Sequence, residues 1–223
     1  MIQDIIRKND IYMIYIIHQS SMIKISLYLL MITKIFAGGT IRCTNIMRHA
    51  ILFDKNMPSV YVHKQLNIED KLEDVVFSAE HIFPRSHLDK KDWNDMHNII
   101  RTINDLNVNR SNYKYIDSLT NDNDWFELKH NNYVNHKQKL FIPNIVSRGF
   151  IARAILYMCK EYDYNHNKII DKHVLLNWYY SYPPCKCERY HNEVIKKFQN
   201  TNNIFITKYN KKTKVLTKFL ENL

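Results

Sequence analysis

The sequence predicts an α+β fold: a mainly helical single domain with a small antiparallel sheet. Two observations favour this fold. Residues 75–77 and 96–100 are suited to short strands, whereas apolar residues recur at helical spacing from residue 145 onward. The 223 residues are enough for one domain with a sizeable core, and the sequence shows neither an internal repeat nor a long Pro, Gly or Ser linker.

Residues 1–43 form an N-terminal apolar segment. Lys24, Lys34 and a polar group at 18–21 interrupt it, so no run approaches the ~20 apolar residues that a membrane span needs. From Met22 onward, a basic head, an apolar stretch and small residues at 37–39 are typical of a secretory signal peptide. The alternatives are a buried helix that packs on the domain and an uncleaved interfacial helix. A signal peptide predicts a secreted or exported protein; otherwise the protein is expected to be intracellular.

The next part of the chain predicts a strand, a connection, a second strand and a helix. Val75–Phe77 suits a buried strand leading into Glu80 and His81, and 96–100 suits a second strand. Thr102–Asp105 has the capping-box pattern of a helix start, which places Asn107 in the first turns of a short helix. A cation would then lie between the first strand and this helix.

Three helices and a basic tail are predicted downstream. The helices are expected over 145–162, over 173–180 before Pro183 and Pro184, and over 188–199 with Val194, Ile195 and Phe198 as a buried stripe. Residues 121–135 are polar and Asn-rich, which indicates a loop. The tail, 207–223, is expected to be solvated, with a frayed helix or an extra phosphate-binding arm as alternatives.

Glu80, His81 and Asn107 are the candidate catalytic and metal-binding residues. The Glu80 carboxylate and the Asn107 amide offer hard oxygen ligands for a cation, and histidine is the usual proton acceptor near neutral pH. Neighbours in a strand point to opposite faces, so a twist or bulge at Pro84 would be needed to bring Glu80 and His81 to one site. Arginine can pair with phosphate through two hydrogen bonds, and the candidates are Arg85, Arg101 and Arg110.

Three segments, in this order, resemble the endonuclease I family of non-specific nucleases. Glu80–Pro84 matches the family's Glu-His-(Val/Ile)-x-Pro, Asp95–Asn98 matches Asp-(Leu/Met)-His-Asn, and Asn107–Asn112 matches Asn-x-x-Arg-x-Asn. Further matches at 141–143, 148–154, 157–158, 175–178, 188–192 and 199–206 extend the resemblance over roughly residues 75–206. The chain departs from the family at Arg101–Thr102, Val108 and Phe150, where the family often has Pro-Ser, Gly and Asp.

This resemblance implies a nuclease domain over 44–206, built around a ββα-metal (His-Me finger) active site. It implies that His81 is the general base that activates water, and that Glu80 and Asn107 ligate one Mg²⁺, with Ca²⁺ or Mn²⁺ as substitutes. The product would keep a 5′-phosphate. Arg85 and Arg110 would act beside His81 in catalysis, and nucleic acid would be contacted by Arg85, Arg101, Arg110 and Arg148.

The implied substrate is DNA, with RNA as a second candidate, cut with little sequence preference. The chain has 32 Lys and Arg against 22 Asp and Glu, a net charge of +10 and a pI of about 9.3, which favours binding to a polyphosphate. The same Lys-, Asn- and Ile-rich composition is also typical of an AT-rich genome, so the charge supports the resemblance without establishing it.

Two other functions stay open. A Zn²⁺ site could use His81, His87, Asp95 and His97, although their spacings are not those of familiar zinc sites. A catalytically inactive nucleic-acid-binding module could retain the fold and the charge. The joint presence of a candidate base and two candidate ligands favours the enzyme, because binding alone needs none of them.

The four cysteines leave the compartment open. Cys159 falls within the predicted core helix and is expected to be a buried thiol. Cys185 and Cys187 flank Lys186, and in an exported protein they could form disulfides, with Cys43 among the partners.

Overall fold

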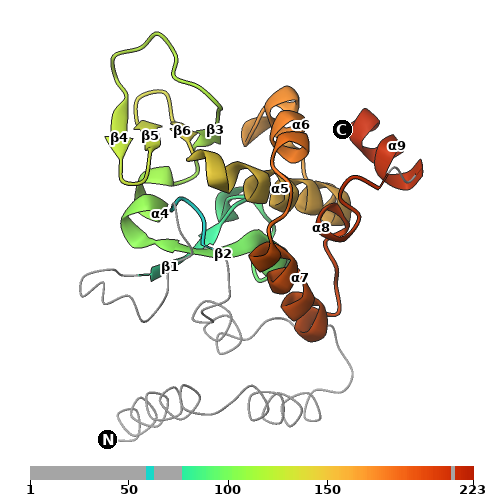
Figure 1. The fold of residues 1–223 in the computed structure, drawn as a ribbon. Coiled ribbons are helices and arrows are strands. Elements are labelled where there is room, and N and C mark those ends of the chain that lie inside the picture. Colours follow the sequence, from blue (N-terminus) through green and yellow to red (C-terminus); the bar gives the residue numbers. More distant parts are fainter. Residues whose placement is uncertain (1–58, 63–76, 212–213) are drawn as a thin grey trace, which may run out of the picture. The chain divides into compact units, whose positions relative to one another are not determined.

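The computed structural model describes residues 59–62, 77–211 and 214–223. The N-terminal segment 1–43, with its signal-peptide and packing-helix alternatives, lies outside these residues, as do Cys43 and the first two residues of the strand predicted at Val75–Phe77. Within the described part, the fold is α+β with two small sheets and a larger helical portion, as the sequence predicts (Figure 1). No helix in that part is both long and apolar enough to span a membrane.

The first sheet is an antiparallel pair of strands, β1 (Phe77–His81) and β2 (Ile99–Ile103). Glu80 pairs with Ile100 and His81 with Ile99. Helix α4 (Asn104–Arg110) follows β2 without a loop and contacts both strands. The predicted order of strand, connection, strand and helix is therefore confirmed.

Two local details of this region differ from the prediction. Met96–Asn98 is a 3-10 turn, η3, and not part of the strand, because the Asp95 side chain accepts a hydrogen bond from the His97 backbone and closes the turn. The capping box does not form, because Thr102 belongs to β2 and its hydroxyl donates to the Val60 carbonyl at 2.8 Å. Ile103 occupies the N-cap position of α4 and offers no side-chain cap.

The connection from β1 to β2 contains two further 3-10 turns, η1 (Arg85–His87) and η2 (Lys90–Asp92). The buried Asn98 side chain, near the end of this connection, is hydrogen-bonded to Phe83, near its start. The Asn98 amide accepts from the Phe83 backbone N–H at 2.7 Å and donates to the Phe83 carbonyl at 2.9 Å. One side chain thus fixes the backbone directly after the Glu80–His81 pair.

The second sheet has four strands in the order β3-β6-β5-β4. They are β3 (Lys114–Tyr115), β4 (Phe126–Leu128), β5 (Asn132–Asn135) and β6 (Leu140–Ile142). The prediction of a loop over 121–135 is wrong for the second half of this segment, which forms the β4–β5 hairpin. His130 and Asn131 turn the hairpin with φ of 63° and 58°, and buried Asn132 donates to the Tyr61 and Lys129 carbonyls. The asparagines here serve turns and buried hydrogen bonds.

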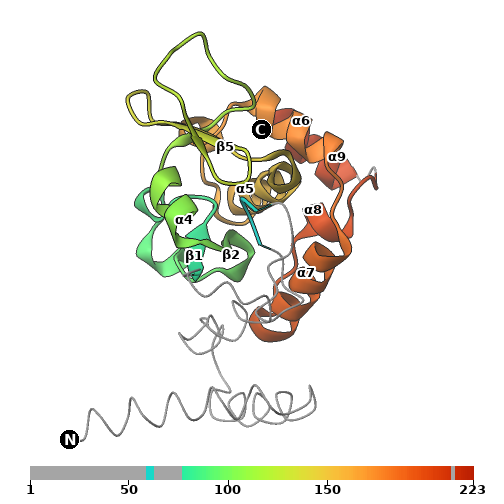
Figure 2. The ribbon, with the colours of Figure 1, turned by 60° about the vertical axis from the view of Figure 1, so that its left-hand side comes forward.

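The described residues of the C-terminal half form five α-helices: α5 (Arg148–Tyr162), α6 (Lys172–Ser181), α7 (Lys186–Gln199), α8 (Ile204–Thr207) and α9 (Lys214–Asn222). Short 3-10 turns η4 (Ile145–Ser147) and η5 (His166–Lys168) complete it. Helix α5 lies between the strands and the other helices (Figures 1 and 2). The three predicted helices correspond to α5, α6 and α7, and of the predicted stripe on α7 Ile195 is fully buried.

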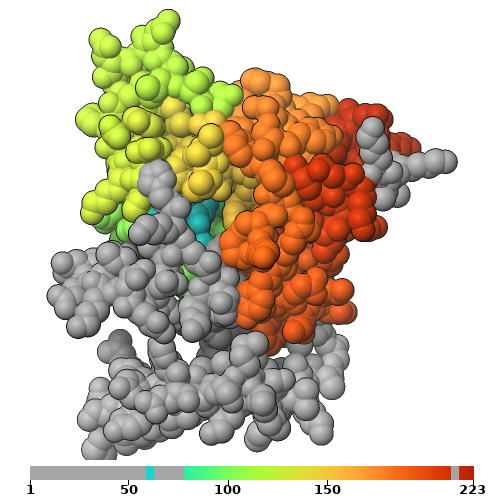
Figure 3. Space-filling view, viewed as in Figure 1, coloured from blue at the N-terminus to red at the C-terminus, as the bar shows by residue number. Residues whose placement is uncertain are grey.

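The prediction that the C-terminal tail is solvated is wrong for part of the tail. Helix α9 places Leu216 and Leu220, four residues apart, in the hydrophobic core, and Phe219 packs against the Phe205 ring. On the surface, residues of the second sheet and of the C-terminal helices adjoin on the face shown in Figure 3.

A buried ion pair joins α5 to α7. The Arg153 guanidinium donates to both carboxylate oxygens of Glu188 at 2.5 and 2.6 Å, and also to the Tyr182 carbonyl. Gly149, one turn earlier, lets the backbone before α7 approach α5, because a Cβ there would collide with the Tyr182 carbonyl oxygen. These contacts explain Gly149 and Arg153 of the 148–154 motif. Phe150 lies on the pocket described below.

The cysteines agree with part of the prediction. Cys159 is a buried free thiol in α5, and burial raises its pKa to about 12. Cys185 and Cys187 are joined to each other by a disulfide at the start of α7.

Candidate active site

Strand β1 directs Glu80 toward a buried polar cluster. The Glu80 side chain is 1% exposed, and its Oε1 accepts from the Tyr61 hydroxyl at 2.8 Å and lies 3.3 Å from the Arg110 guanidinium. Burial raises the pKa of Glu80, while the Arg110 charge and the Tyr61 hydrogen bond act in the opposite direction. Both contacts use Oε1.

Two tyrosines complete this cluster. The Tyr61 and Tyr115 hydroxyls lie 2.5 Å apart, and the Arg110 guanidinium stacks 4.5 Å from the centre of the Tyr115 ring. Burial raises the pKa of both tyrosines, so both stay protonated at neutral pH and Tyr61 can donate to Glu80. The sequence motifs include neither tyrosine, and Tyr61 lies in a short apolar run that carries no motif.

His81 points toward the β1–β2 connection and is 9% exposed. Its Nε2 lies 2.9 Å from the Trp93 carbonyl oxygen. A carbonyl oxygen can only accept a hydrogen bond, so Nε2 carries the proton in the neutral ring. The other nitrogen, Nδ1, is then the basic one. Glu80 and His81 keep the alternation of a strand and meet different neighbours.

Asn107 packs its amide against the same strand. Its Nδ2 donates to the Ser78 hydroxyl at 2.7 Å and approaches the Ala79 carbonyl at 3.4 Å, directly before Glu80. Because the Ala79 carbonyl can only accept, this contact identifies the amide nitrogen and leaves Oδ1 as the oxygen able to ligate a cation. A carboxylate and an amide oxygen fit Mg²⁺, which takes one or two protein oxygens and keeps water and phosphate at its other positions.

The four candidate phosphate-binding arginines have different surroundings. Arg110 is 1% exposed and donates to the carbonyls of His81 at 3.2 Å and Ile82 at 2.6 Å, so it braces the end of β1. Arg101 is equally buried, and its Nε donates to the Ser59 hydroxyl. Arg148 donates to the Asp117 carbonyl at 2.8 Å. Of the four, Arg85 alone is exposed, and its guanidinium lies 4.0 Å from the centre of the Trp93 ring.

The residues proposed for the Zn²⁺ alternative have other partners. Asp95 accepts from the hydroxyls of Tyr157 and Tyr162, and the His97 ring packs on the Tyr157 ring at 4.3 Å between centroids. In the part of the chain that the structure describes, no three His, Cys, Asp or Glu side chains form a metal-binding group. Asp95 and His97 thus join η3 to α5.

The family model described as Endonuclease I matches residues 14–210. The chain belongs to the endonuclease I family. It is therefore a nuclease by family, and the resemblance carried by the three motifs is confirmed. The match begins within the N-terminal apolar segment and ends just inside the basic tail, so it covers more of the chain than the motifs alone.

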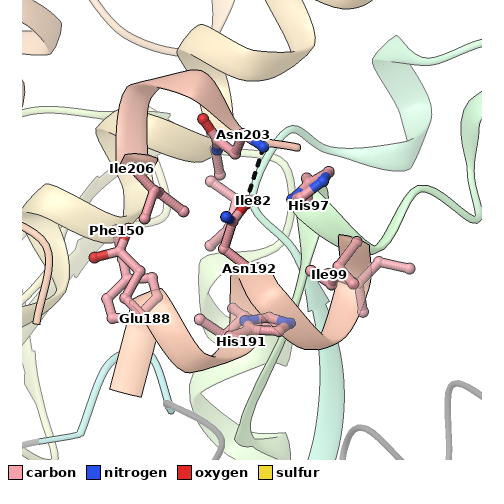
Figure 4. A pocket seen from close by; sticks show the side chains of 12 residues that line it. Ile82, His97, Ile99, Phe150, Glu188, His191, Asn192, Asn203 and Ile206 are labelled. Atoms are coloured by element: carbon pink, nitrogen blue, oxygen red, sulfur yellow. Dashed lines mark hydrogen bonds between the residues drawn. The ribbon is translucent and has the colours of Figure 1, made fainter. Parts of the chain in front are cut away.

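A separate pocket of about 20 Å³ lies between the end of β1, η3, β2 and helices α5, α7 and α8 of this endonuclease I family member (Figure 4). His97 and His191 are on its wall, each with a buried Nε2 that has no hydrogen-bond partner among the described residues. The backbone N–H of Asn203 donates to the Asn192 side chain at 2.9 Å (Figure 4). Burial, and then the nearby His97, lowers the pKa of His191 to about 3. None of the candidate catalytic residues lines this pocket.

Proposed function

We propose that this chain is a Mg²⁺-dependent endonuclease that hydrolyses phosphodiester bonds of DNA, and also of RNA, with little sequence preference. The observation that carries the proposal is the placement of Glu80, His81 and Asn107 on β1 and on the helix packed against it. The low sequence preference rests on the family resemblance and on the lack of any recognisable base-reading motif in the sequence.

In this proposal His81 is the general base. The hydrogen bond from Nε2 to the Trp93 carbonyl holds the ring, and Nδ1 takes a proton from the attacking water. A base held by a backbone carbonyl keeps its orientation without depending on another titrating side chain. The water then attacks phosphorus opposite the 3′-oxygen, so the 5′-phosphate stays on the product.

The Glu80 carboxylate and the Asn107 side-chain oxygen would hold the metal. Bound Mg²⁺ would polarise the scissile phosphate and stabilise the leaving 3′-oxygen. The Tyr61 hydrogen bond and the Arg110 ion pair fix the Glu80 carboxylate, so less side-chain freedom is lost when the cation binds. We assign Arg110 a positioning role, since it is buried behind the carboxylate, and we assign Arg85 to the substrate phosphate, since it is exposed.

The metal assignment is tested by comparing two asparagines of α4. Asn107→Ala should raise the Mg²⁺ concentration needed for half-maximal cleavage by about tenfold or more, the effect expected for loss of a ligand. Asn109→Ala is the matched control, because Asn109 donates to the Asp105 carbonyl within its own helix. Equal Mg²⁺ requirements for wild type and Asn107→Ala would remove Asn107 from the ligand set.

The substrate and product are read in the same assay. End-labelled duplex DNA, single-stranded DNA and RNA are incubated with enzyme and Mg²⁺, and the new termini are tested for a phosphate removable by phosphatase. The proposal predicts 5′-phosphate ends and cuts at many sequences. Ends with 3′-phosphate would contradict the assigned direction of attack.

A further inference from the structure

We propose that Trp93 is a positioning residue that holds both the general base and the substrate-binding Arg85. This inference rests on the proposed nuclease function. The sequence motifs do not include Trp93, which lies in the connection between β1 and β2, just after η2. Three contacts of this residue carry the argument, and each involves a different part of it.

The first contact is made by the main chain. The Trp93 carbonyl accepts from His81 Nε2 at 2.9 Å, which fixes both the tautomer and the plane of the base. The orientation of that carbonyl depends on where the Trp93 backbone lies. Any movement of the residue is therefore transmitted to Nδ1 of His81.

The second contact is made by the ring. The Arg85 guanidinium lies over the Trp93 indole, 4.0 Å from its centre. The N–H donors of a guanidinium lie in its own plane, so stacking on one face leaves these donors available for a phosphate. Arg85 is an exposed side chain, and the ring restricts the space that its long stem can sample.

The third contact anchors the residue itself. The indole N–H donates to the Leu88 carbonyl at 3.2 Å, and the partly buried ring packs against the hydrophobic core. Tyr164 fixes the start and the end of η2, directly before Trp93: its hydroxyl accepts from the Asp89 N–H at 2.8 Å and donates to the Asp92 carboxylate at 2.6 Å. The indole ring of Trp93 and the chain directly before it are thus both fixed, which sets the positions of the ring that meets Arg85 and of the carbonyl that meets His81.

The test is a double-mutant cycle on cleavage of a short duplex with Mg²⁺. Arg85→Ala should lower kcat/KM by about 10- to 100-fold, as expected for a lost charge-assisted hydrogen bond. Trp93→Leu should lower it by about 3- to 30-fold through KM, the range of a cation–π contact. In the Arg85→Ala background, Trp93→Leu should change KM by less than about twofold, because the stacked guanidinium is already gone, whereas any fall in kcat, which reports the base held by the Trp93 carbonyl, should be the same in both backgrounds.

Two further variants control for the general effect of removing a tryptophan and for misfolding of Trp93→Leu. Trp125→Leu is the matched control: that indole donates to Thr120 in the loop before β4, and the change should leave kcat/KM unaltered. Trp93→Phe keeps an aromatic face and should lose about two- to fivefold, again only when Arg85 is present. This variant carries the test if Trp93→Leu does not fold.

The inference is overturned if the rise in KM caused by Trp93→Leu or Trp93→Phe is as large without Arg85 as with it, or if both variants cleave like wild type. A second measurement distinguishes failure of the Trp93 inference from failure of the proposed function. It is the binding of labelled single-stranded DNA in EDTA, followed by anisotropy in a His81→Ala background. A wild type that does not cleave refutes the proposed catalysis. Additive losses of binding in the same cycle refute the role of Trp93.

Discussion

Replacing Arg110 by Met tests the idea that this arginine supports the site and does not bind substrate. The change removes a guanidinium that is 1% exposed and leaves the Glu80 carboxylate buried without its ion pair. Breaking a buried pair from one side costs about 3–5 kcal/mol. The Tyr61 hydrogen bond remains, and a stranded carboxyl can take up a proton, so the lower end applies. We expect a loss of about 3 kcal/mol, or roughly 6–12 °C in Tm for a chain of this size.

The assay is urea unfolding at pH 7 in EDTA, so that no bound cation contributes. Arg110→Met combined with Glu80→Gln should recover about half of the loss, because a neutral amide still accepts from Tyr61 but is cheaper to bury. Arg85→Met, the same change at an exposed arginine that stacks on Trp93, should stay within about 1 kcal/mol of wild type. A loss below about 1 kcal/mol for Arg110→Met, or no recovery in the double variant, would refute the reasoning.

Three further predictions concern stability. The pKa of His191 is about 6.5 in the unfolded chain and about 3 in the folded protein, so the free energy of unfolding should fall as the pH drops between these values, by up to ~1.4 kcal/mol per pH unit. His191→Gln should therefore reduce the difference between the urea midpoints measured at pH 7 and at pH 5. Gly149→Ala should cost about 1–3 kcal/mol in thermal melts, because its Cβ meets the Tyr182 backbone; an unchanged Tm would show that α5 can move away. Leu220→Ala should cost about 2–3 kcal/mol, whereas a solvated tail would lose almost nothing.

The elements that the sequence predicts well are those with local signals. The spacing from Glu80 to Asn107 and the helical period of 145–162 are both visible within short windows, and the structure has the corresponding strands and helices. Leu216 and Leu220 also carried a local signal, an apolar pair four residues apart, but the basic charge of the tail favoured solvent instead.

The details that could not be predicted depend on partners far along the chain. Tyr61 meets Glu80 from 19 residues away, and nothing in its own segment marks it as a donor to a buried carboxylate. The hydroxyl of Thr102 had a local use as a helix cap, yet it donates to Val60 because the residue belongs to β2. In both cases a tertiary contact, and not the local sequence, decides which partner the hydroxyl has.

The arginines show the same limit in the site itself. Arg85 and Arg110 are equally suited to phosphate by residue type, and only their burial distinguishes them. No sequence motif can identify the Trp93 carbonyl as a partner of His81, because every residue has a carbonyl and only the fold places this one beside the ring.

The most direct test of the account is cleavage of supercoiled plasmid by wild type and His81→Ala, with Mg²⁺ and with EDTA, together with DNA binding by both proteins. His136→Ala, which changes a histidine in the turn between β5 and β6, is the control. The account predicts Mg²⁺-dependent cutting by wild type and control, and a loss of at least about 100-fold in His81→Ala with binding retained. A folded wild type that binds DNA without cutting it, or a His81→Ala variant that cuts normally, would contradict it.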